Sequence, residues 1–220
     1  MSTTWGEVRE EFRDTFRDIT QSYIDNDEAA RILRRVLRKI GASEAYTFQE
    51  QEYTLTLTGA SQYDLNTLIP GWKKIKTITS PTSNGATQPI ELTPLDIKDF
   101  QVSVDRNAYA IFNHRYLRVY SPTSSPLTGT VKIIYYTQYF LSNSGTLVST
   151  PVDDNTVFLI PDSYMNVVSE GMVMLGFRKD RSNRADFTDA KEAFESALQE
   201  LRDTHSIIVE TPTRSMGGAF

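Results

Sequence analysis

Residues 25–41 read DNDEAARILRRVLRKIG, and residues 53–58 read YTLTLT. In the first stretch the apolar residues recur at steps of three and four, which predicts an amphipathic helix. In the second stretch apolar residues alternate with threonine, which predicts a half-buried strand. The change of period between the two stretches predicts that the chain passes from a helical section into a β section.

The N-terminal section is predicted to hold two helices. Thr4 and Glu7 have the spacing of a capping box at the start of the first helix. Asp25 and Gly41 are the predicted N-cap and C-cap of the second helix. Apolar residues cover one face of the first helix: Trp5, Val8, Phe12, Phe16 and Ile19.

Two further helices are predicted near the C-terminus. Pro161 suits the first turn of a helix, because its φ is fixed and it has no N–H group to leave unpaired. An apolar face then runs from Tyr164 toward Phe177, and a final helix begins near Asp186. No helix in this chain is long enough to be stable without packing against another, so the N- and C-terminal helices are expected to form one bundle.

The section from residue 46 to residue 139 follows a period of two and is predicted to form a small antiparallel sheet or barrel. A hairpin is expected at residues 108–112 and 116–120, with Asn113-His114-Arg115 as its turn. Residues 131–137 are the most β-prone stretch. Residues 142–155 are polar and turn-rich, which predicts a loop.

The predicted fold class is therefore α+β, a helical bundle with an inserted small antiparallel β domain and an extended C-terminal tail. Residues 1–45 hold the N-terminal helices, 46–156 the β domain, 157–205 the C-terminal helices and 206–220 the tail. The tail has apolar residues with no evident place in their own domain, which predicts that it docks onto a partner. These residues are Ile207, Ile208, Val209 and Phe220.

No sequence pattern typical of a catalytic or metal site is present. The chain has no cysteine, and its two histidines, His114 and His205, each lack a second histidine at metal-ligand spacing. Asp153-Asp154-Asn155 lacks the fixed pattern of an EF-hand and is interpreted as a polar loop that caps the helix at Pro161. Gly-rich phosphate loops and nucleophile elbows are absent. The protein is predicted not to be an enzyme, with no catalytic, cofactor-binding or metal residues and no cofactor.

The net charge of −5 is opposite in sign to that of a typical nucleic-acid binder. An acidic wall repels phosphates, which suits a protein past which DNA moves. No apolar stretch approaches the roughly 20 residues that cross a bilayer. Glu7, Glu10 and Glu11 occupy the place where a signal peptide needs an apolar run. No membrane association is expected.

Two basic segments have two interpretations each. The second helix carries Arg31, Arg34, Arg35, Arg38 and Lys39 away from its apolar stripe, either as a solvated face or as a surface that meets an acidic neighbour. The connection between the last two helices carries Arg178, Lys179, Arg181 and Arg184, either as a solvated loop or as a contact with DNA phosphates or an acidic partner.

The order of segments resembles the head-to-tail connector adaptors of tailed bacteriophages, the neck proteins that bind beneath the portal. The resemblance covers most of the chain from about residue 27 to residue 202. It is carried by AARILRRVLRKIG at 29–41, YTLTLTGASQYDLNTLIPGWKKIKTI at 53–78, YLRVYSP at 116–122, VKIIYYTQY at 131–139 and VFLIPDSYMNVVSEGMVMLGFRKD at 157–180. The first predicted helix, residues 5–19, departs from the shorter family members, and its role stays open.

The resemblance implies a ring of identical subunits, often a dodecamer, seated on the portal protein in the neck of the virion after synthesis in the host cytoplasm. It further implies a downstream tail or nozzle protein as a second partner, and a channel through which DNA passes without sequence recognition. Two other functions stay open. The aromatic content suits a tail or baseplate module that binds carbohydrate or a receptor, and the basic segments suit a nucleic-acid-binding protein.

Overall fold

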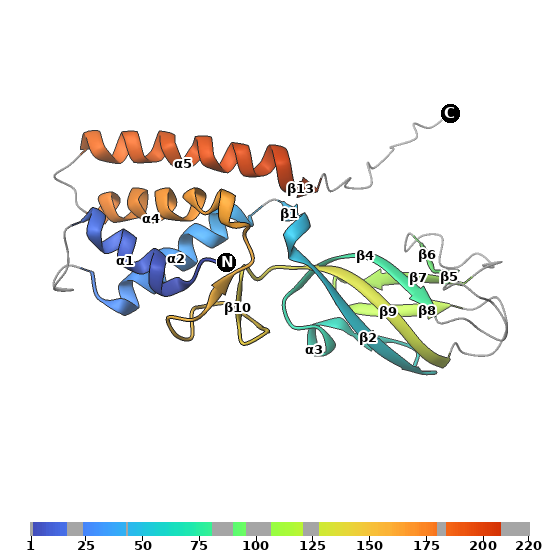
Figure 1. Cartoon of the computed structure of the whole chain (residues 1–220). Coiled ribbons are helices and arrows are strands. Elements are labelled where there is room, and N and C mark those ends of the chain that lie inside the picture. Colours follow the sequence, from blue (N-terminus) through green and yellow to red (C-terminus); the bar gives the residue numbers. More distant parts are fainter. Residues whose placement is uncertain are drawn as a thin grey trace, which may run out of the picture. The chain divides into compact units, whose positions relative to one another are not determined.

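The computed structural model describes residues 2–16, 24–42, 44–80, 90–95, 107–120, 128–179 and 184–207 (Figure 1). Helices and sheets are both present, which confirms the α+β class. The chain divides into two compact units. The helical unit comprises Met1–Gln49 and Tyr139–Phe220, and the β unit comprises Glu50–Gln138. Residues 139–156, which the sequence assigned to the β domain, belong to the helical unit.

Helix α1 spans Trp5–Thr15, and its start has the capping box that the sequence predicted. The Glu7 carboxylate accepts from the Thr4 backbone N–H at 2.8 Å, and the Thr4 hydroxyl accepts from the Glu7 backbone N–H at 3.4 Å. Trp5, Val8 and Phe12 are buried, as the apolar face requires. Ile19, the last residue of the predicted face, lies outside the described residues.

Helix α2 spans Asn26–Ile40 between the predicted caps Asp25 and Gly41. The Asp25 carboxylate accepts from the Glu28 backbone N–H at 2.7 Å. Gly41 has a φ of −87°, so this cap does not require the left-handed conformation that favours glycine. Close packing explains the glycine instead, because a Cβ there would lie 2.8 Å from Cε2 of Phe140.

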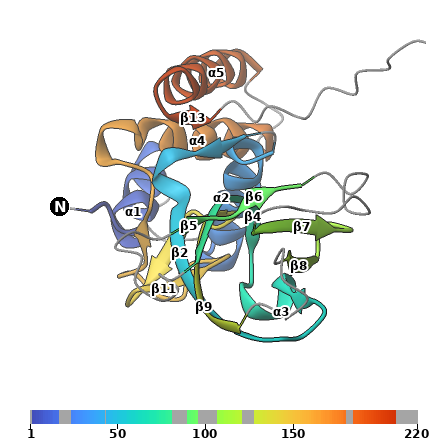
Figure 2. The same ribbon diagram turned by 90° about the vertical axis from the view of Figure 1, so that its right-hand side faces the viewer.

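Helix α4 (Asn166–Lys179) lies between α5 (Arg184–His205) and the α1–α2 pair in Figures 1 and 2, and it packs against all three helices. The sequence predicted a single apolar face for α4, but the helix is buried on several sides, because three helices cover it. Its buried residues include Val167, Val168, Met172, Met174 and Leu175.

Two glycines permit this packing around α4. A Cβ on Gly171 would lie 2.6 Å from Cγ1 of Val36 on α2 and 2.9 Å from Cε2 of Phe194 on α5. A Cβ on Gly176 would collide with the ring of Phe16, the C-cap residue of α1. The absence of a side chain at these two positions therefore brings the three neighbouring helices close to α4.

The segment that precedes α4 differs from the prediction. Pro161 precedes a single 3₁₀ turn, η3 (Asp162–Tyr164), and α4 begins only at Asn166. Residues 142–155 are not a plain loop, since β10 (Leu141–Asn143) and β11 (Thr146–Val148) form a hairpin there. Strand β12 (Val157–Phe158) pairs with the other side of β10. These strands, of two or three residues each, are too short to show an alternating pattern in the sequence.

The first sheet of the β unit has the order β2-β9-β4-β5. Its strands are β2 (Glu50–Thr58), β4 (Trp72–Ser80), β5 (Ile90–Glu91) and β9 (Thr128–Thr137). Strand β9 is central and pairs antiparallel with both long neighbours. Register shifts in β4 between Trp72 and Lys74 and between Ile75 and Thr77 explain why β4 alternates less cleanly than β2.

The second sheet has the order β3-β8-β7-β6. Its strands are β3 (Tyr63–Asp64), β6 (Thr93–Pro94), β7 (Ala108–Phe112) and β8 (Tyr116–Tyr120), and the short helix α3 (Leu65–Leu68) follows β3. The predicted hairpin is present, and Asn113 and His114 adopt positive φ in its turn. The β unit differs from a single antiparallel sheet or barrel in having two sheets, and β6 runs parallel to β7.

One apolar core is shared by both sheets of the β unit. Leu55 and Ile133 come from the first sheet, while Tyr109 and Leu117 come from the second. The helical unit has a separate core, to which all four of its long helices contribute. No helix within the described ranges is long and apolar enough to span a membrane.

Candidate docking surfaces

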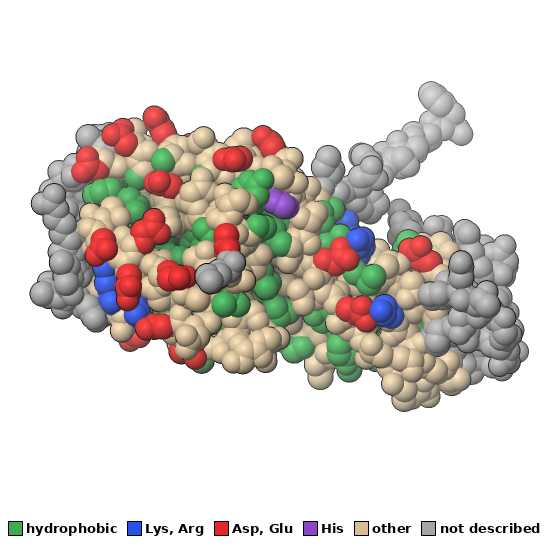
Figure 3. Space-filling model, in the orientation of Figure 1, with side chains coloured by type: hydrophobic (Ala, Val, Ile, Leu, Met, Phe, Trp, Pro, Cys, Tyr) green, Lys and Arg blue, Asp and Glu red, His purple; other side chains and the backbone are tan. Residues whose placement is uncertain are grey.

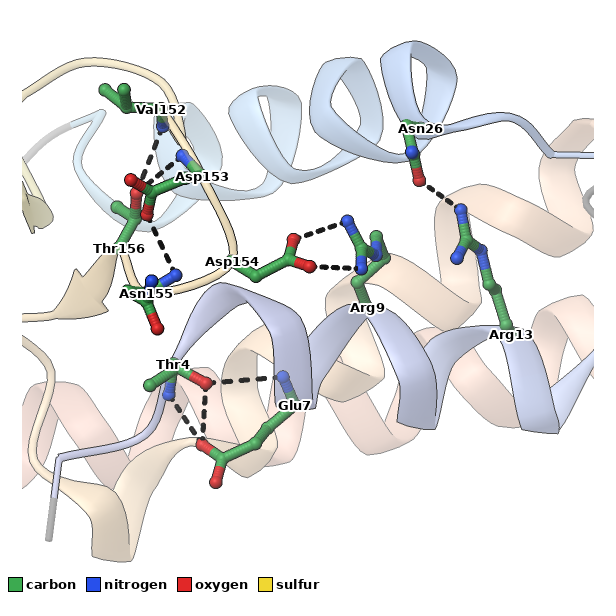
Figure 4. Close-up of polar contacts among 10 residues, drawn as sticks. All are labelled: Thr4, Glu7, Arg9, Arg13, Asn26, Val152, Asp153, Asp154, Asn155 and Thr156. Atoms are coloured by element: carbon green, nitrogen blue, oxygen red, sulfur yellow. Dashed lines mark hydrogen bonds and ion pairs between the residues drawn. The ribbon is translucent and has the colours of Figure 1, made fainter.

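The loop at residues 152–156 holds the start of α1 (Figure 4). The Arg9 guanidinium donates two parallel hydrogen bonds to the Asp154 carboxylate, at 2.6 and 2.9 Å. The backbone N–H groups of Trp5 and Gly6 donate to the carbonyls of Thr156 and Asp154, at 2.8 and 3.0 Å. The sequence had associated this loop with the helix at Pro161, whereas in the structure it binds the first turn of α1.

The loop is itself shaped by Thr156, which is fully buried. Its hydroxyl accepts from the backbone N–H groups of Val152 and Asp153, at 3.0 and 3.3 Å. The Asp153 carboxylate accepts from the Asn155 backbone N–H at 2.9 Å. These bonds leave the Asp154 carboxylate to point toward Arg9, as Figure 4 shows.

A second contact fixes the chain before α1. The Thr3 backbone N–H and hydroxyl both donate to the Asp162 carboxylate, each at 2.8 Å. The hydroxyl bond, followed by the backbone bond, lowers the pKa of Asp162, since both bonds favour the charged carboxylate. The pKa of Glu7 is lowered by the same kind of bonds from the Thr4 backbone and hydroxyl.

Arg13 joins α1 to the start of α2. Its guanidinium donates to the side-chain carbonyl of Asn26, the first residue of α2 (Figure 4). Arg13 is only 8% exposed, an unusual degree of burial for a charged side chain. Together with Arg9 and Thr3, Arg13 makes α1 an integral part of the helical unit. The sequence had left the role of this first helix open.

The start of the predicted tail is paired within its own unit. Strand β13 (Ser206–Ile207) pairs antiparallel with β1 (Ala45–Tyr46), which places Ile207 opposite Ala45. Ile207 is half-buried, so the expectation that it has no partner in its own domain is wrong. Ile208, Val209 and Phe220 lie outside the described residues.

Aromatic side chains surround the end of α5, just before β13. The His205 ring lies 4.8 Å from the Tyr164 ring and 5.8 Å from the Phe48 ring, centroid to centroid. Nδ1 of His205 lies 2.9 Å from the hydroxyl oxygen of Thr47, in the 3₁₀ turn η1 (Thr47–Gln49). The Tyr46 hydroxyl donates to the carbonyl of Ile40 at 2.9 Å. These contacts hold the end of α5, immediately before β13, in place within the helical unit.

The exposed faces of α2 and α5 carry opposite charge. On α2 the exposed residues are basic over two turns: Arg31, Arg34, Arg35, Arg38 and Lys39. On α5 the exposed charged residues are mainly acidic: Asp189, Glu192, Glu195, Glu200 and Asp203. Figure 3 shows acidic side chains along α5, at the top of that view. The basic face was predicted from the sequence and the acidic face was not, although the acidic residues recur at helical spacing on the side away from the apolar stripe.

In the β unit, ion pairs join residues of different strands and of the turn between β7 and β8. Lys76 and Lys132 bind Glu50 and Glu52, at 2.7 and 2.8 Å. Arg115 donates to the Asp64 carboxylate at 3.0 and 2.6 Å, and these bonds lower the pKa of Asp64. Since these pairs lie at the surface, with Asp64 half-buried and the other groups exposed, they add little stability.

No part of the described chain brings three His, Asp or Glu side chains together in a way that would hold a metal ion. Comparison with protein families gives a match between residues 3–215 and the model described as SU10 adaptor protein. The chain belongs to the SU10 adaptor family. This is a family of phage head-tail adaptors, and it confirms the resemblance that the order of segments indicated. A comparison with curated proteins found no match.

The basic connection of this adaptor is only partly described. Arg178 is exposed near the end of α4. The side chains of Lys179 and Arg184 and the whole of Arg181 lie outside the described residues. The contact of this segment with DNA or an acidic partner therefore stays a prediction.

Proposed function

We propose that this adaptor is a structural subunit that forms a ring beneath the phage portal, joins the capsid to the tail and leaves a channel for DNA. The observation that carries the proposal is the family match, which extends over residues 3–215 and so includes both units. In this proposal the protein resides in the neck of the virion. Its partners are the portal protein, other copies of itself in a dodecamer, and a downstream tail or nozzle protein.

The helical unit is the proposed ring wall, a bundle into whose chain the β unit is inserted. Its central helix α4 is covered by three others, and α1 is tied down by Arg9 and Thr3. Such a unit keeps its shape when neighbours press against it. Each subunit makes a head-to-tail contact with the next, and the rotation between them closes the ring. Repetition around the ring turns individually weak contacts into a stable assembly.

The remaining parts have proposed roles at the two ends of the ring. Residues 208–220, which follow β13 in the sequence, have the proposed role of docking onto the portal or a neighbouring subunit, where their apolar side chains would become buried. The β unit meets the downstream tail protein. The net charge of −5 limits the sticking of DNA as it passes. None of these roles needs a catalytic group.

Co-expression of the chain with the portal protein from the same phage genome tests this function. We expect a stable complex, in which electron microscopy shows a second ring stacked on the portal ring. Portal protein expressed alone is the control. If the chain fails to bind the portal and instead binds glycans saturably, it is a tail or baseplate module. If the isolated monomer binds DNA in a strongly salt-dependent manner at physiological salt, it is a nucleic-acid-binding protein.

A further inference from the structure

We infer that neighbouring subunits of the ring meet through the basic face of α2 on one copy and the acidic face of α5 on the next. The inference rests on the proposed function, because it assigns the contact that would close the ring. It commits to a second copy of this chain as the occupant of both faces.

Among the described residues, the basic face of α2 has one weak ion pair and no further partner that would balance its charge. Within the described chain, Arg34, Arg35 and Arg38 form no ion pair. Arg31 lies 3.6 Å from Glu28, and its side chain is still 68% exposed. Lys39 lies over the ring of Phe194, with its Nζ 5.9 Å from the ring centroid. The face extends about 12 Å along the helix axis, from residue 31 to residue 39.

This face is unfavourable in a lone subunit. Arg31 and Arg35 are four residues apart, as are Arg34 and Arg38, and like charges at this spacing repel by about 0.2–0.5 kcal/mol per pair. An acidic neighbour would remove that repulsion. Most of the cations are arginine, which binds carboxylates through two parallel hydrogen bonds and is enriched in protein interfaces.

The acidic face of α5 has the matching features. Successive turns carry Asp189, Glu192 and Glu195, and further along Glu200 and Asp203, over about 21 Å of helix. Within α5, one of these acids, Glu195, forms an ion pair with Lys191 at 3.6 Å. Arg202, the other cation in this part of α5, is directed to Glu44 at 3.2 Å.

The positions of the two helices suit a head-to-tail contact. Both α2 and α5 bury their apolar stripes against α4, and both meet it at Gly171. Their charged residues are on the sides of the helices turned away from these stripes, so both faces are exposed in the subunit. One subunit can therefore offer its basic face to one neighbour and its acidic face to the other, which is the requirement for a closed ring.

Helix α1 is the other acidic helix of this unit, but two of its carboxylates already have partners within the subunit. The Glu7 carboxylate closes the capping box, and the Glu11 carboxylate accepts from the Ser169 hydroxyl at 3.0 Å. Arg9 and Arg13 interrupt its acidic run. DNA is a poor occupant of the α2 face, because the α1 and α5 acids of the same unit repel phosphates.

Charge reversal on portal rings tests the inference. The basic-face variant is Arg35→Glu with Arg38→Glu, and the acidic-face variant is Asp189→Lys with Glu192→Lys. We expect each variant alone to lower the fraction of portal rings that carry a complete adaptor ring more than tenfold. A mixture of the two should restore complete rings, since the reversed α2 of one variant faces the reversed α5 of the other. Recovery in the mixture also shows that both variants are folded.

The matched control reverses acids on α1, Glu10→Lys with Asp14→Lys, and should leave ring formation unchanged. Unimpaired rings from either single-face variant, a mixture that fails to recover, or loss of rings in the α1 control would each overturn this inference, while wild-type rings on the portal still support the proposed function. Absence of wild-type rings would overturn the proposed function and the inference with it.

Discussion

Arg9 and Asp154 are 145 positions apart in the sequence, yet their side chains form a bidentate ion pair with N–O distances of 2.6 and 2.9 Å. Arg9 lies on α1, and Asp154 belongs to the loop that precedes β12. The Arg9 side chain is 13% exposed and that of Asp154 is 58% exposed, so the pair is partly shielded from water. This contact joins α1 to the loop that precedes β12. Both segments belong to the helical unit.

Replacing Arg9 by alanine should weaken the attachment of α1. Hydrogen bonds to charged groups contribute about 1.5–3 kcal/mol, and exposure of Asp154 places this pair near the lower end. We expect Arg9→Ala to reduce the free energy of unfolding by about 1.5 kcal/mol in urea titrations. Arg31→Ala is the control, because its ion pair at 3.6 Å is exposed. Equal effects of the two variants would show that the Asp154 contact has no special weight.

Gly171→Ala should destabilise the helical unit although alanine favours a helix. The added Cβ would lie 2.6 Å from Val36 and 2.9 Å from Phe194, so α2 and α5 must move away from α4. Overpacking of this kind costs about 1–3 kcal/mol, which exceeds the gain of about 1 kcal/mol in helix propensity. Ser196→Ala on the exposed face of α5 is the control and should not lower the melting temperature. An unchanged or higher melting temperature for Gly171→Ala would contradict the described packing.

The long amphipathic elements were predictable, because each carries a periodic pattern together with local end signals. Helix α2 begins after Asp25 and ends at Gly41 as the sequence indicated. Strand β2 alternates as predicted, with Leu55 and Leu57 buried between exposed threonines. Both elements bury their apolar residues on one side. One-sided burial requires apolar residues at regular spacing, and this spacing is what the sequence shows.

The features that the sequence did not reveal depend on distant contacts. The strands β10 and β11 of the hairpin have three residues each, so they are too short to show a period. The burial of α4 on several sides arises from three helices that meet it from separate parts of the chain. The partners Asp154 for Arg9 and Asp162 for Thr3 are set by the fold, since no local spacing brings them together. The acidic residues of α5 can be recognised in the sequence by their helical spacing. Their proposed role follows only from comparison with the basic face of α2.

Acid should loosen the start of α1 through Asp162 and Glu7. Hydrogen bonds from Thr3 and Thr4 lower the pKa of these carboxyls in the folded chain. A lowered folded pKa means that the unfolded chain binds the proton more readily. The stabilising contribution is therefore present above the unfolded pKa and is lost as the pH falls through the folded pKa.

The measurement is thermal unfolding of the wild type and of Asp162→Asn between about pH 7 and about pH 3. The asparagine keeps an oxygen for Thr3 but cannot titrate, so the variant should lose less stability between the two pH values than the wild type does. Identical pH profiles would show that Asp162 does not contribute to acid sensitivity.

Leu33→Asp should prevent the helical unit from folding. Leu33 has no exposed surface and lies in the core that α2 shares with α4 and α5. A carboxylate there would be buried without a partner, and the smaller side chain would leave a cavity. Together these two effects should lower the free energy of unfolding by at least about 3–5 kcal/mol. Arg34→Ala, at the adjacent exposed position, is the control and should melt as the wild type does. A soluble Leu33→Asp variant with a cooperative melting transition would show that this core is misplaced.

Truncation at the C-terminus separates folding from docking. Ser206 and Ile207 pair with Tyr46 and Ala45, so deletion of residues 208–220 leaves that strand pair intact. We expect this deletion to leave the melting temperature unchanged and to abolish attachment to portal rings in pull-down experiments. Deletion of residues 206–220 removes β13 as well and should also lower the melting temperature, because Ala45 and Tyr46 then lose their backbone partners. Full attachment of the shorter deletion to the portal would refute a docking role for the last residues, even if the ring itself were confirmed.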